Sequence, residues 1–332
     1  MLKAWRDGVR RVNSAPAILL GLWIATVVLT IPFTLEIRDR VEGHLGASLE
    51  GNAAATGVNY DWLQEFMGQA NGIATTVKPT VVGFAATLDN LSSFVDATHR
   101  PAIVAAASIT YLVVLTFLSG GIIDRLARNR AVGASGFFAV SGVFFFRFVR
   151  LGLFAAAAYS LLFGWFHPLL FDSLYPRLTA DVTSERTAFF IRAALYVIFA
   201  LPLVAVNLLF DNAKVRAVVE DRRSMLGAIL AAAAFIRRNR LGSLSVYALN
   251  VVMFGSVLAA YALAAPGVGA AGASMWVAFT IGQIYVIARL WVKLLFWASE
   301  TAFFQDRLAH AGYVRQPEPE WPDSPAAEAL TH

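Results

Sequence analysis

The sequence predicts an all-α fold: a polytopic membrane bundle of six transmembrane helices, with amphipathic interfacial helices and a small helical extracytoplasmic cap. The composition is 58% hydrophobic and only 15% charged, with a mean hydropathy of +0.62, unlike a soluble domain of 332 residues. Six apolar stretches are each near the ~20 residues with which a helix crosses ~30 Å of hydrocarbon. These stretches are 15–35, 102–123, 149–171, 188–210, 244–265 and 275–297.

The basic residues predict the orientation of the chain. Of the 27 Lys and Arg residues, 20 fall in the N-terminal segment, in alternate loops and in the C-terminal segment, all on one side of the predicted bundle. Basic residues resist translocation, so both termini are expected on the cytoplasmic side of the membrane. The other seven are Arg38, Arg40, Lys78, Arg100, Arg177, Arg186 and Arg192. Because the positive charges flank spans, we expect no nucleic-acid partner.

Five regions follow from this topology. They are a cytoplasmic interfacial helix (1–14), the first transmembrane helix (15–35), an extracytoplasmic helical cap (36–100), a five-span bundle with two cytoplasmic amphipathic helices (101–310) and a disordered cytoplasmic tail (311–332). In the first region, Leu2, Trp5, Val9 and Val12 recur at helical spacing. The last region is acidic and rich in proline, which favours disorder.

The outer cap contains three amphipathic pieces: 37–49, 60–67 and 79–95. The third opens with Pro79 and has apolar residues at alternating spacings of three and four, which define what we call the apolar seam (79–95). The apolar residues of the seam are Val81, Phe84, Leu88, Leu91 and Val95. Such a stripe needs an apolar partner. It could pack within the cap, against the outer leaflet, or against a second copy or another membrane protein.

Polar side chains inside spans are the usual pointer to a transport pathway. Asn207, Asn250 and Gln283 occupy spans four, five and six, and Arg289 lies near the inner end of span six. All four are candidates for a pathway. Hydrogen bonding between helices is the alternative role for the three amides, and Arg289 could reach lipid phosphates or pair with Asp211 or Glu300.

A second candidate surface is basic and faces the cytoplasm. Two amphipathic segments precede spans three and five, and the arginines at their ends form what we call the basic belt: Arg147, Arg150, Arg237, Arg238 and Arg240. Anionic head groups attract such residues, so we expect the belt to bind anionic phospholipids. Topology alone would also place positive charges here.

The sequence offers little to catalysis. It contains no cysteine, and no HExxH, GxSxG or Walker-type motif appears. The outer segments do contain acids and histidines, and Asp61 and Glu65 share one helical face. Catalysis would require Asp61 or Glu65 to lie within hydrogen-bonding reach of His44, His99 or His167. We therefore expect no catalytic residue, no metal and no cofactor.

One resemblance concerns the connection between spans four and five. The sequence of residues 211–223, Asp-Asn-Ala-Lys-Val-Arg-Ala-Val-Val-Glu-Asp-Arg-Arg, and the sequence of residues 235–239, Phe-Ile-Arg-Arg-Asn, resemble this connection in uncharacterised bacterial six-span membrane proteins. More loosely, the region 102–310 is similar to the membrane domain attached to some bacterial glycerophosphodiester phosphodiesterases. The chain departs from that arrangement, since it has no catalytic barrel and its segment 36–100 has no counterpart. The resemblance implies a helical bundle in a bacterial inner membrane.

The expected function is non-enzymatic. We expect a scaffold or accessory subunit that interacts with anionic lipid or membrane partners. The alternative is a transporter or permease component for a lipid-like or amphipathic solute. A transporter should have a polar cavity between Asn207, Asn250 and Gln283, whereas a scaffold should be closed there and expose the apolar seam.

Overall fold

The computed structural model describes residues 1–55, 59–80, 83–98, 101–265 and 273–308, and this part of the chain contains helices and no strand. Six helices are long and apolar enough to cross a membrane. The all-α polytopic fold predicted from the sequence is therefore confirmed, and the protein is a multi-pass integral membrane protein. The spans are α2 (Pro16–Ala47), α6 (Ala102–Arg128), the run Ala134–Thr179, α9 (Glu185–Val219), α11 (Arg240–Ala264) and α12 (Ala273–Arg307).

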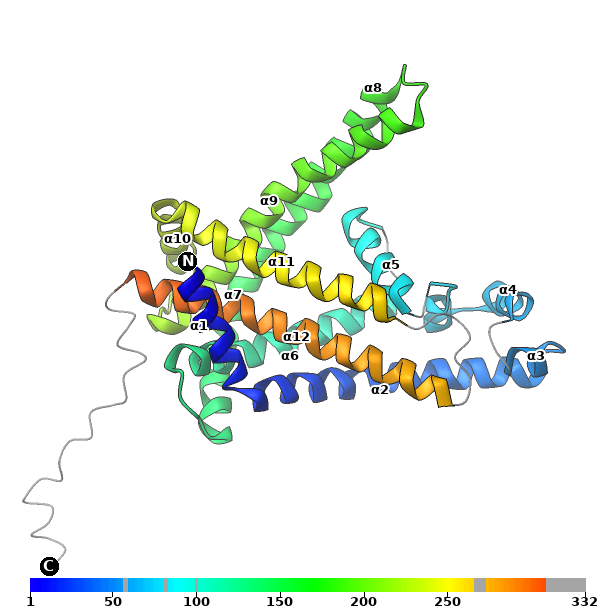
Figure 1. The fold of residues 1–332 in the computed structure, drawn as a ribbon, viewed down its shortest axis with the longest axis horizontal. Helices are drawn as coiled ribbons and strands as arrows, with labels where there is room; N and C mark the ends of the chain where they lie inside the picture. Colours follow the sequence, from blue (N-terminus) through cyan, green and yellow to red (C-terminus); the bar gives the residue numbers. More distant parts are fainter. Residues whose placement is uncertain (56–58, 81–82, 99–100, 266–272, 309–332) are drawn as a thin grey trace, which may run out of the picture.

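Two ends of the bundle can be distinguished in Figure 1. One end holds α1 (Leu2–Asn13), the turn between α6 and α7, and α10 (Met225–Arg238); we call it the α10 end. The other holds the short helices α3, α4 and α5, and we call it the cap end. The expected tail (311–332) lies outside the described residues.

The first expected piece of the cap is a continuation of α2. This helix runs on for three turns past the predicted span, and exposed ion pairs lie along this part, Arg40 with Glu36 at 2.9 Å and Arg38 with Glu42 at 3.3 Å. The remaining cap helices are α3 (Gly51–Ala55), α4 (Tyr60–Gln69), the 3₁₀ turn η1 (Gly72–Thr76) and α5 (Gly83–Val95). Asn59 caps α4 by accepting a hydrogen bond from the backbone N–H of Trp62 at 2.9 Å.

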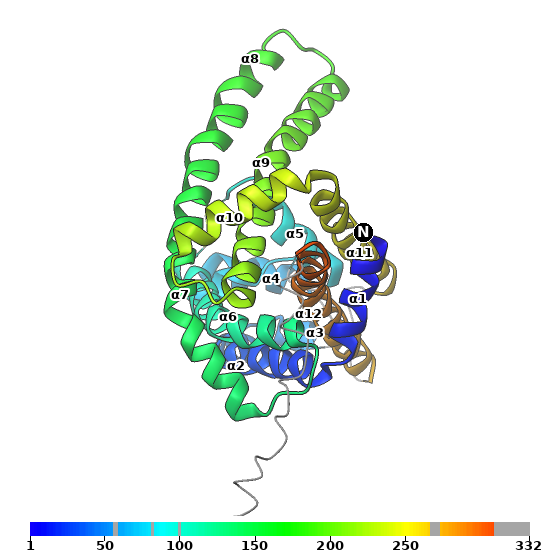
Figure 2. The ribbon, with the colours of Figure 1, turned by 90° about the vertical axis from the view of Figure 1, so that its left-hand side faces the viewer.

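The third span has an irregular course. Helix α7 (Ala134–Leu161) passes into two π-helical stretches, η2 (Leu162–Phe166) and η3 (Leu169–Leu174), and then into α8 (Tyr175–Thr179). The two stretches flank Pro168, which has no N–H to donate and so disturbs the regular helical hydrogen bonds. This run and α9 form a long hairpin that diverges from the bundle of α2, α6, α11 and α12 (Figures 1 and 2).

The two predicted amphipathic segments fold differently. The second forms α10 as a separate helix, which ends where Asn239 departs from helical geometry before α11 begins. The first is not separate: α6 continues to Arg128, Asn129 adopts a left-handed conformation at φ 53°, and α7 then runs unbroken into the membrane span. A single continuous helix therefore holds both Arg147 and the span that follows it.

The buried core lies towards the α10 end. Its largest apolar cluster includes Ile122, Ile123 and Leu126 of α6 with Leu294 and Leu295 of α12. Towards the cap end the helices bury few side chains, and within the apolar part of α2 only 6% of the residues are buried. Exposed apolar surface on this scale is typical of contact with lipid or with another membrane protein.

Helix α1 packs on α12 with a face that overlaps the expected apolar stripe at Val12, and Trp5 and Val9 of the stripe are partly buried. Its buried residues are Ala4, Gly8, Arg11 and Val12, whereas Leu2, part of the expected apolar stripe, is 58% exposed. The Arg11 side chain is completely buried. It donates to Asp7 on its own helix, to the carbonyl of Leu126 and to Gln305 Oε1 at the end of α12. A polar network therefore holds α1 against the bundle.

Candidate functional site

The basic belt is divided between paired and unpaired arginines. Arg147 donates to Asp221 Oδ1 at 2.6 Å, and its guanidinium lies 4.9 Å from the ring centre of Phe144. Arg150 is exposed and contacts the carbonyl of Phe146 on its own helix at 3.3 Å. Arg147 therefore joins α7 to the turn between α9 and α10, and Arg150 remains at the surface.

Arg237, Arg238 and Arg240 are all exposed where α10 ends and α11 begins, and none forms an ion pair within the described part of the chain. The acids of the same connection are already engaged. Glu220 accepts from Arg216 at 2.6 Å and also pairs with Arg222, and Asp221 is the partner of Arg147. The three arginines therefore form an uncompensated positive surface at the α10 end.

The four candidate pathway residues do not come together. Asn250 is fully buried. It accepts from Trp5 Nε1 at 3.0 Å and donates to Ser299 Oγ at 2.8 Å, which joins α1, α11 and α12. Gln283 accepts from Trp23 Nε1 at 2.9 Å. Arg289 is exposed and lies 5.6 Å from the ring centre of Tyr285. Asn250 and Gln283 therefore each bond to a tryptophan, and neither lines the cavity that Asn207 faces.

Asn207 does face a cavity, of about 430 Å³, between α6, α7, α9 and α12. Most of its lining is apolar, and polar groups gather at one part of it. The Tyr159 hydroxyl donates to Asn207 Oδ1 there. One and two turns further along α9, Asp211 and Lys214 line the same cavity. The other lining residues are Leu112, Leu115, Thr116, Ser119, Phe148, Leu151, Gly152, Ala155, Ala156, Phe210 and Trp297.

Asp211 and Lys214 form an ion pair at the cavity wall. Lys214 Nζ lies 3.0 Å from Asp211 Oδ1, and Trp297 Nε1 donates to the same oxygen at 3.2 Å. The Lys214 ammonium also lies 5.5 Å from the ring centre of Trp297, close enough for a cation–π interaction. Both charged side chains remain partly exposed, at 21% and 30%. They can therefore contact a molecule that enters the cavity.

A buried carboxylate lies one turn beyond Trp297 on α12. Glu300 is 3% exposed, and neither of its carboxylate oxygens has a hydrogen-bond partner in the described structure. Lys293, one turn before Trp297, has its ammonium 5.6 Å from the ring centre of Tyr111. Ionisable side chains inside a membrane bundle are costly and usually functional.

Sequence reasoning did not select Asp211, Lys214 or Glu300 as site residues because they follow the last residues of predicted spans four and six. Asp211 comes directly after Phe210, and Glu300 comes three residues after Trp297. The feature that could have indicated these residues is the continuation of both helices beyond the predicted spans. Helix α9 reaches Val219 and α12 reaches Arg307, so the charges fall inside helices rather than in loops.

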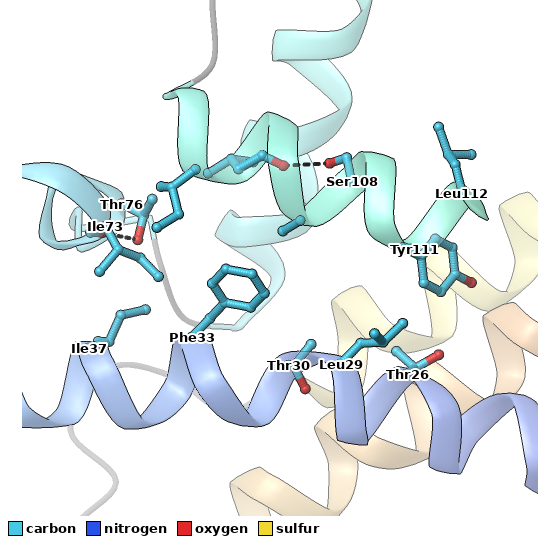
Figure 3. Close-up of a pocket in the computed structure, with 13 residues that line it drawn as sticks. Thr26, Leu29, Thr30, Phe33, Ile37, Ile73, Thr76, Ser108, Tyr111 and Leu112 are labelled. Atoms are coloured by element: carbon cyan, nitrogen blue, oxygen red, sulfur yellow. Dashed lines mark hydrogen bonds between the residues drawn. The ribbon is translucent and has the colours of Figure 1, made fainter. Parts of the chain in front are cut away.

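A second hollow lies between α2 and α6 near the cap end. This groove of about 570 Å³ is lined by α2, η1 and α6 (Figure 3). Phe33 and Ile37 of α2 lie on one side, Ile73 of η1 at the end, and Tyr111 of α6 on the other side. Its hydroxyl groups at Thr76 and Ser108 donate to carbonyls of their own helical segments. The groove therefore presents mainly apolar surface.

The outer acids and histidines do not assemble in the described structure. Glu65 accepts from Ser48 Oγ at 2.8 Å, while His44 packs edge-on against Trp62 and Phe66. His167 is buried among aromatic side chains, and its Nε2 lies 3.0 Å from the carbonyl of Val95. His99 lies outside the described residues. Among the residues described, no three His, Asp or Glu side chains could hold a metal ion.

The apolar seam is largely uncovered. Helix α5 has no buried residue, and Leu88, Leu91 and Phe94 are each about half exposed. Aromatic contacts lie at its two ends: Phe84 meets Tyr261 of α11, and Phe94 meets Phe163 of the hairpin. Val81 lies outside the described residues.

Comparison with models of known protein families, with curated proteins and with solved structures finds no match for this chain.

Proposed function

We propose that this multi-pass membrane protein is a non-enzymatic scaffold or accessory subunit of the bacterial inner membrane that binds anionic phospholipids through its basic belt. One observation carries the proposal. Arg237, Arg238 and Arg240 are exposed together without ion-pair partners, while Glu220 and Asp221 of the same connection are paired with other arginines.

The electrostatic free energy of binding to anionic lipid is large enough to change lipid retention measurably. Each Lys or Arg near an anionic bilayer surface contributes ~1 kcal/mol, so the three arginines together give ~3 kcal/mol, which corresponds to roughly a hundredfold in lipid retention. In this proposal the α10 end faces the cytoplasm, in agreement with the distribution of basic residues along the chain. Arg147 has a different role, because it is held by Asp221.

The test is lipid retention by the purified full chain. The triple variant Arg237→Gln, Arg238→Gln, Arg240→Gln should co-purify with far less cardiolipin in native mass spectra than the unaltered protein. A matched control removes three exposed arginines at the other side of the predicted bundle: Arg38→Gln, Arg40→Gln and Arg177→Gln. Equal cardiolipin retention by the two triple variants would overturn the proposal.

A scaffold also needs a surface for its partner. The exposed apolar seam supplies one, either for a second copy of this chain or for another membrane protein. Leu88 and Leu91 lie near the middle of this surface, away from the contacts that Phe84 and Phe94 make at the two ends of α5.

A second candidate function is transport of a lipid-like or amphipathic solute, and the cavity beside Asp211 and Lys214 favours it. Asn250 and Gln283 would not take part, because their side-chain oxygens accept hydrogen bonds from Trp5 and Trp23. In proteoliposomes a transporter should speed the movement of a fluorescent phospholipid between leaflets. No acceleration over protein-free liposomes would exclude this class of substrate.

A further inference from the structure

The cavity beside α9 combines the two surfaces that an amphiphile requires. Its α7 wall contains Gly152, Ala155 and Ala156, which share one helical face and leave space, and Leu115 of α6 and Phe210 of α9 also line it. Gly152 and Ala156 are exposed. Since these residues belong to predicted membrane spans, the cavity is accessible from the lipid side of the bundle. A hydrocarbon chain can occupy this apolar part.

The polar part presents both signs of charge. The Lys214 ammonium has three N–H donors, of which one points to Asp211. On the Asp211 carboxylate, Oδ1 receives both Lys214 and Trp297, so Oδ2 is the oxygen that can accept from a ligand. A neutral pair of this kind attracts a single anion weakly. It is complementary to a head group that carries one negative and one positive group, because each ligand charge then meets its opposite.

We infer that this cavity binds a zwitterionic amphiphile with a primary amine, of the phosphatidylethanolamine class, which enters from the bilayer. Lys214 binds the phosphate, and Asp211 accepts hydrogen bonds from the ammonium. The chain lies against the small residues of α7. A primary ammonium donates hydrogen bonds to a carboxylate, whereas a quaternary ammonium has no N–H to donate. The site therefore discriminates between ethanolamine and choline head groups.

This site is independent of the basic belt. Lys214 and Asp211 lie inside the bundle between α6, α7, α9 and α12, whereas Arg237, Arg238 and Arg240 are exposed around the α10–α11 junction. The belt has only positive charge and suits anionic lipid, while the cavity has a balanced pair. Substitutions in one site should leave lipid binding at the other site unchanged.

The experiment uses phospholipids with a photoactivatable diazirine in one acyl chain and the full chain in nanodiscs. Three probes share that chain and differ in head group: phosphatidylethanolamine, phosphatidylcholine and phosphatidylglycerol. After illumination, peptide mass spectrometry locates the label. The ethanolamine probe should label segments 112–119 and 148–159, which line the cavity. The choline and glycerol probes should label them at least about threefold less.

Two variants test the assignment. Asp211→Asn with Lys214→Gln removes both charges but keeps polar side chains at both positions, and should lower cavity labelling by about tenfold, the factor expected for lost charge-assisted hydrogen bonds. Gly152→Leu fills the cavity from α7 and should also lower it. Gly142→Leu is the matched control on the same helix, ~15 Å along its axis. At both glycines an added Cβ meets no atom within 4 Å, so both variants should fold.

The outcomes separate the alternatives. Equal labelling by the three probes, or labelling of Gly152→Leu equal to that of Gly142→Leu, would overturn the inference. Stronger labelling by the glycerol probe would also overturn it, since the cavity would then select an anion. In the triple variant of the basic belt, the cavity should be labelled as in the unaltered protein. If the belt does not bind anionic lipid, the labelling result for the cavity therefore still stands.

Discussion

Gly8 of α1 lies directly against Ser299 of α12: a Cβ built on the glycine would stand 2.7 Å from the serine Cα. The first helix of the chain and the last described helix therefore touch through their backbones. Trp5 and Ser299 extend this contact, because both are hydrogen-bonded to Asn250 of α11. At this point α1 is part of the bundle core.

Gly8→Val should destabilise the protein by about 1–3 kcal/mol, since the added side chain would force the two helices apart. The measurement is the Tm of the detergent-solubilised protein by intrinsic fluorescence. Gly21→Val on α2 is the matched control, because a Cβ there meets nothing within 4 Å. Equal Tm values for the two variants would show that α1 does not dock against α12.

Arg11→Met should cost about 3–5 kcal/mol, the range found when one partner of a buried charged network is removed. The Arg11 side chain is 0% exposed, and its loss leaves the Leu126 carbonyl and Gln305 without their donor. Arg10→Met is the control: Arg10 also pairs with Asp7, yet it is 75% exposed. The exposed pair should contribute little, so a Tm for Arg10→Met as low as that of Arg11→Met would contradict this account.

Glu300→Gln should raise the Tm. Both carboxylate oxygens of Glu300 are buried without hydrogen-bond partners. Such a group must either keep a charge without a partner or bind a proton at neutral pH, and either costs free energy that an amide of the same shape avoids. Glu42→Gln on the exposed part of α2 should change the Tm little. A lower Tm for Glu300→Gln than for the unaltered protein would mean that the charge of Glu300 is stabilising where it lies.

The contact between Asp96 and the hairpin should depend on pH. A hydrogen bond from the Tyr196 hydroxyl is the main cause that lowers the pKa of Asp96, with smaller contributions from Ser92 and Arg192 against the opposing effect of burial. Because the folded pKa lies below the ordinary 3.8, the contact stabilises fully above that value and is lost as pH falls through the lowered folded pKa.

Spin labels on this cysteine-free chain can measure the effect, at Asn90→Cys on α5 and Ala194→Cys on α9. The distance distribution between them should stay narrow at neutral pH and broaden only at pH below 3.8. Asp96→Asn should give a broader distribution that changes little with pH. A transition that persists in Asp96→Asn would assign the pH dependence to another group.

Leu88→Asp tests the proposal that the apolar seam joins two copies of the chain. Leu88 is 50% exposed on α5, so an added carboxylate should disrupt an apolar interface without disturbing the bundle. The mass of the detergent-solubilised protein by light scattering should fall to that of a monomer. Asn90→Asp places the same charge on the same helix off the seam and should retain the dimer. An unchanged mass for Leu88→Asp would exclude this interface.

The six spans could be predicted because a membrane span is a local property. Twenty apolar residues in a row must form a helix in hydrocarbon, whatever lies beside them, since no water is present to satisfy the backbone. The helix ends were less predictable. Helix α9 continues from Phe210 to Val219 because its next residues are buried against α10 and α12, a contact that hydropathy does not register.

The sequence by itself therefore determined the membrane location, the number of spans and the positions of the basic belt, because these depend on composition along the chain. Only the tertiary structure decided which polar groups meet. Asn207, Asn250 and Gln283 looked equivalent, yet of the three only Asn207 lines the cavity between α6, α7, α9 and α12. Its neighbours there, Asp211 and Lys214, belong to the continuation of α9, and the opposite wall comes from α6 and α7. Contacts between side chains of different helices depend on how the helices pack, and local sequence patterns do not specify that packing.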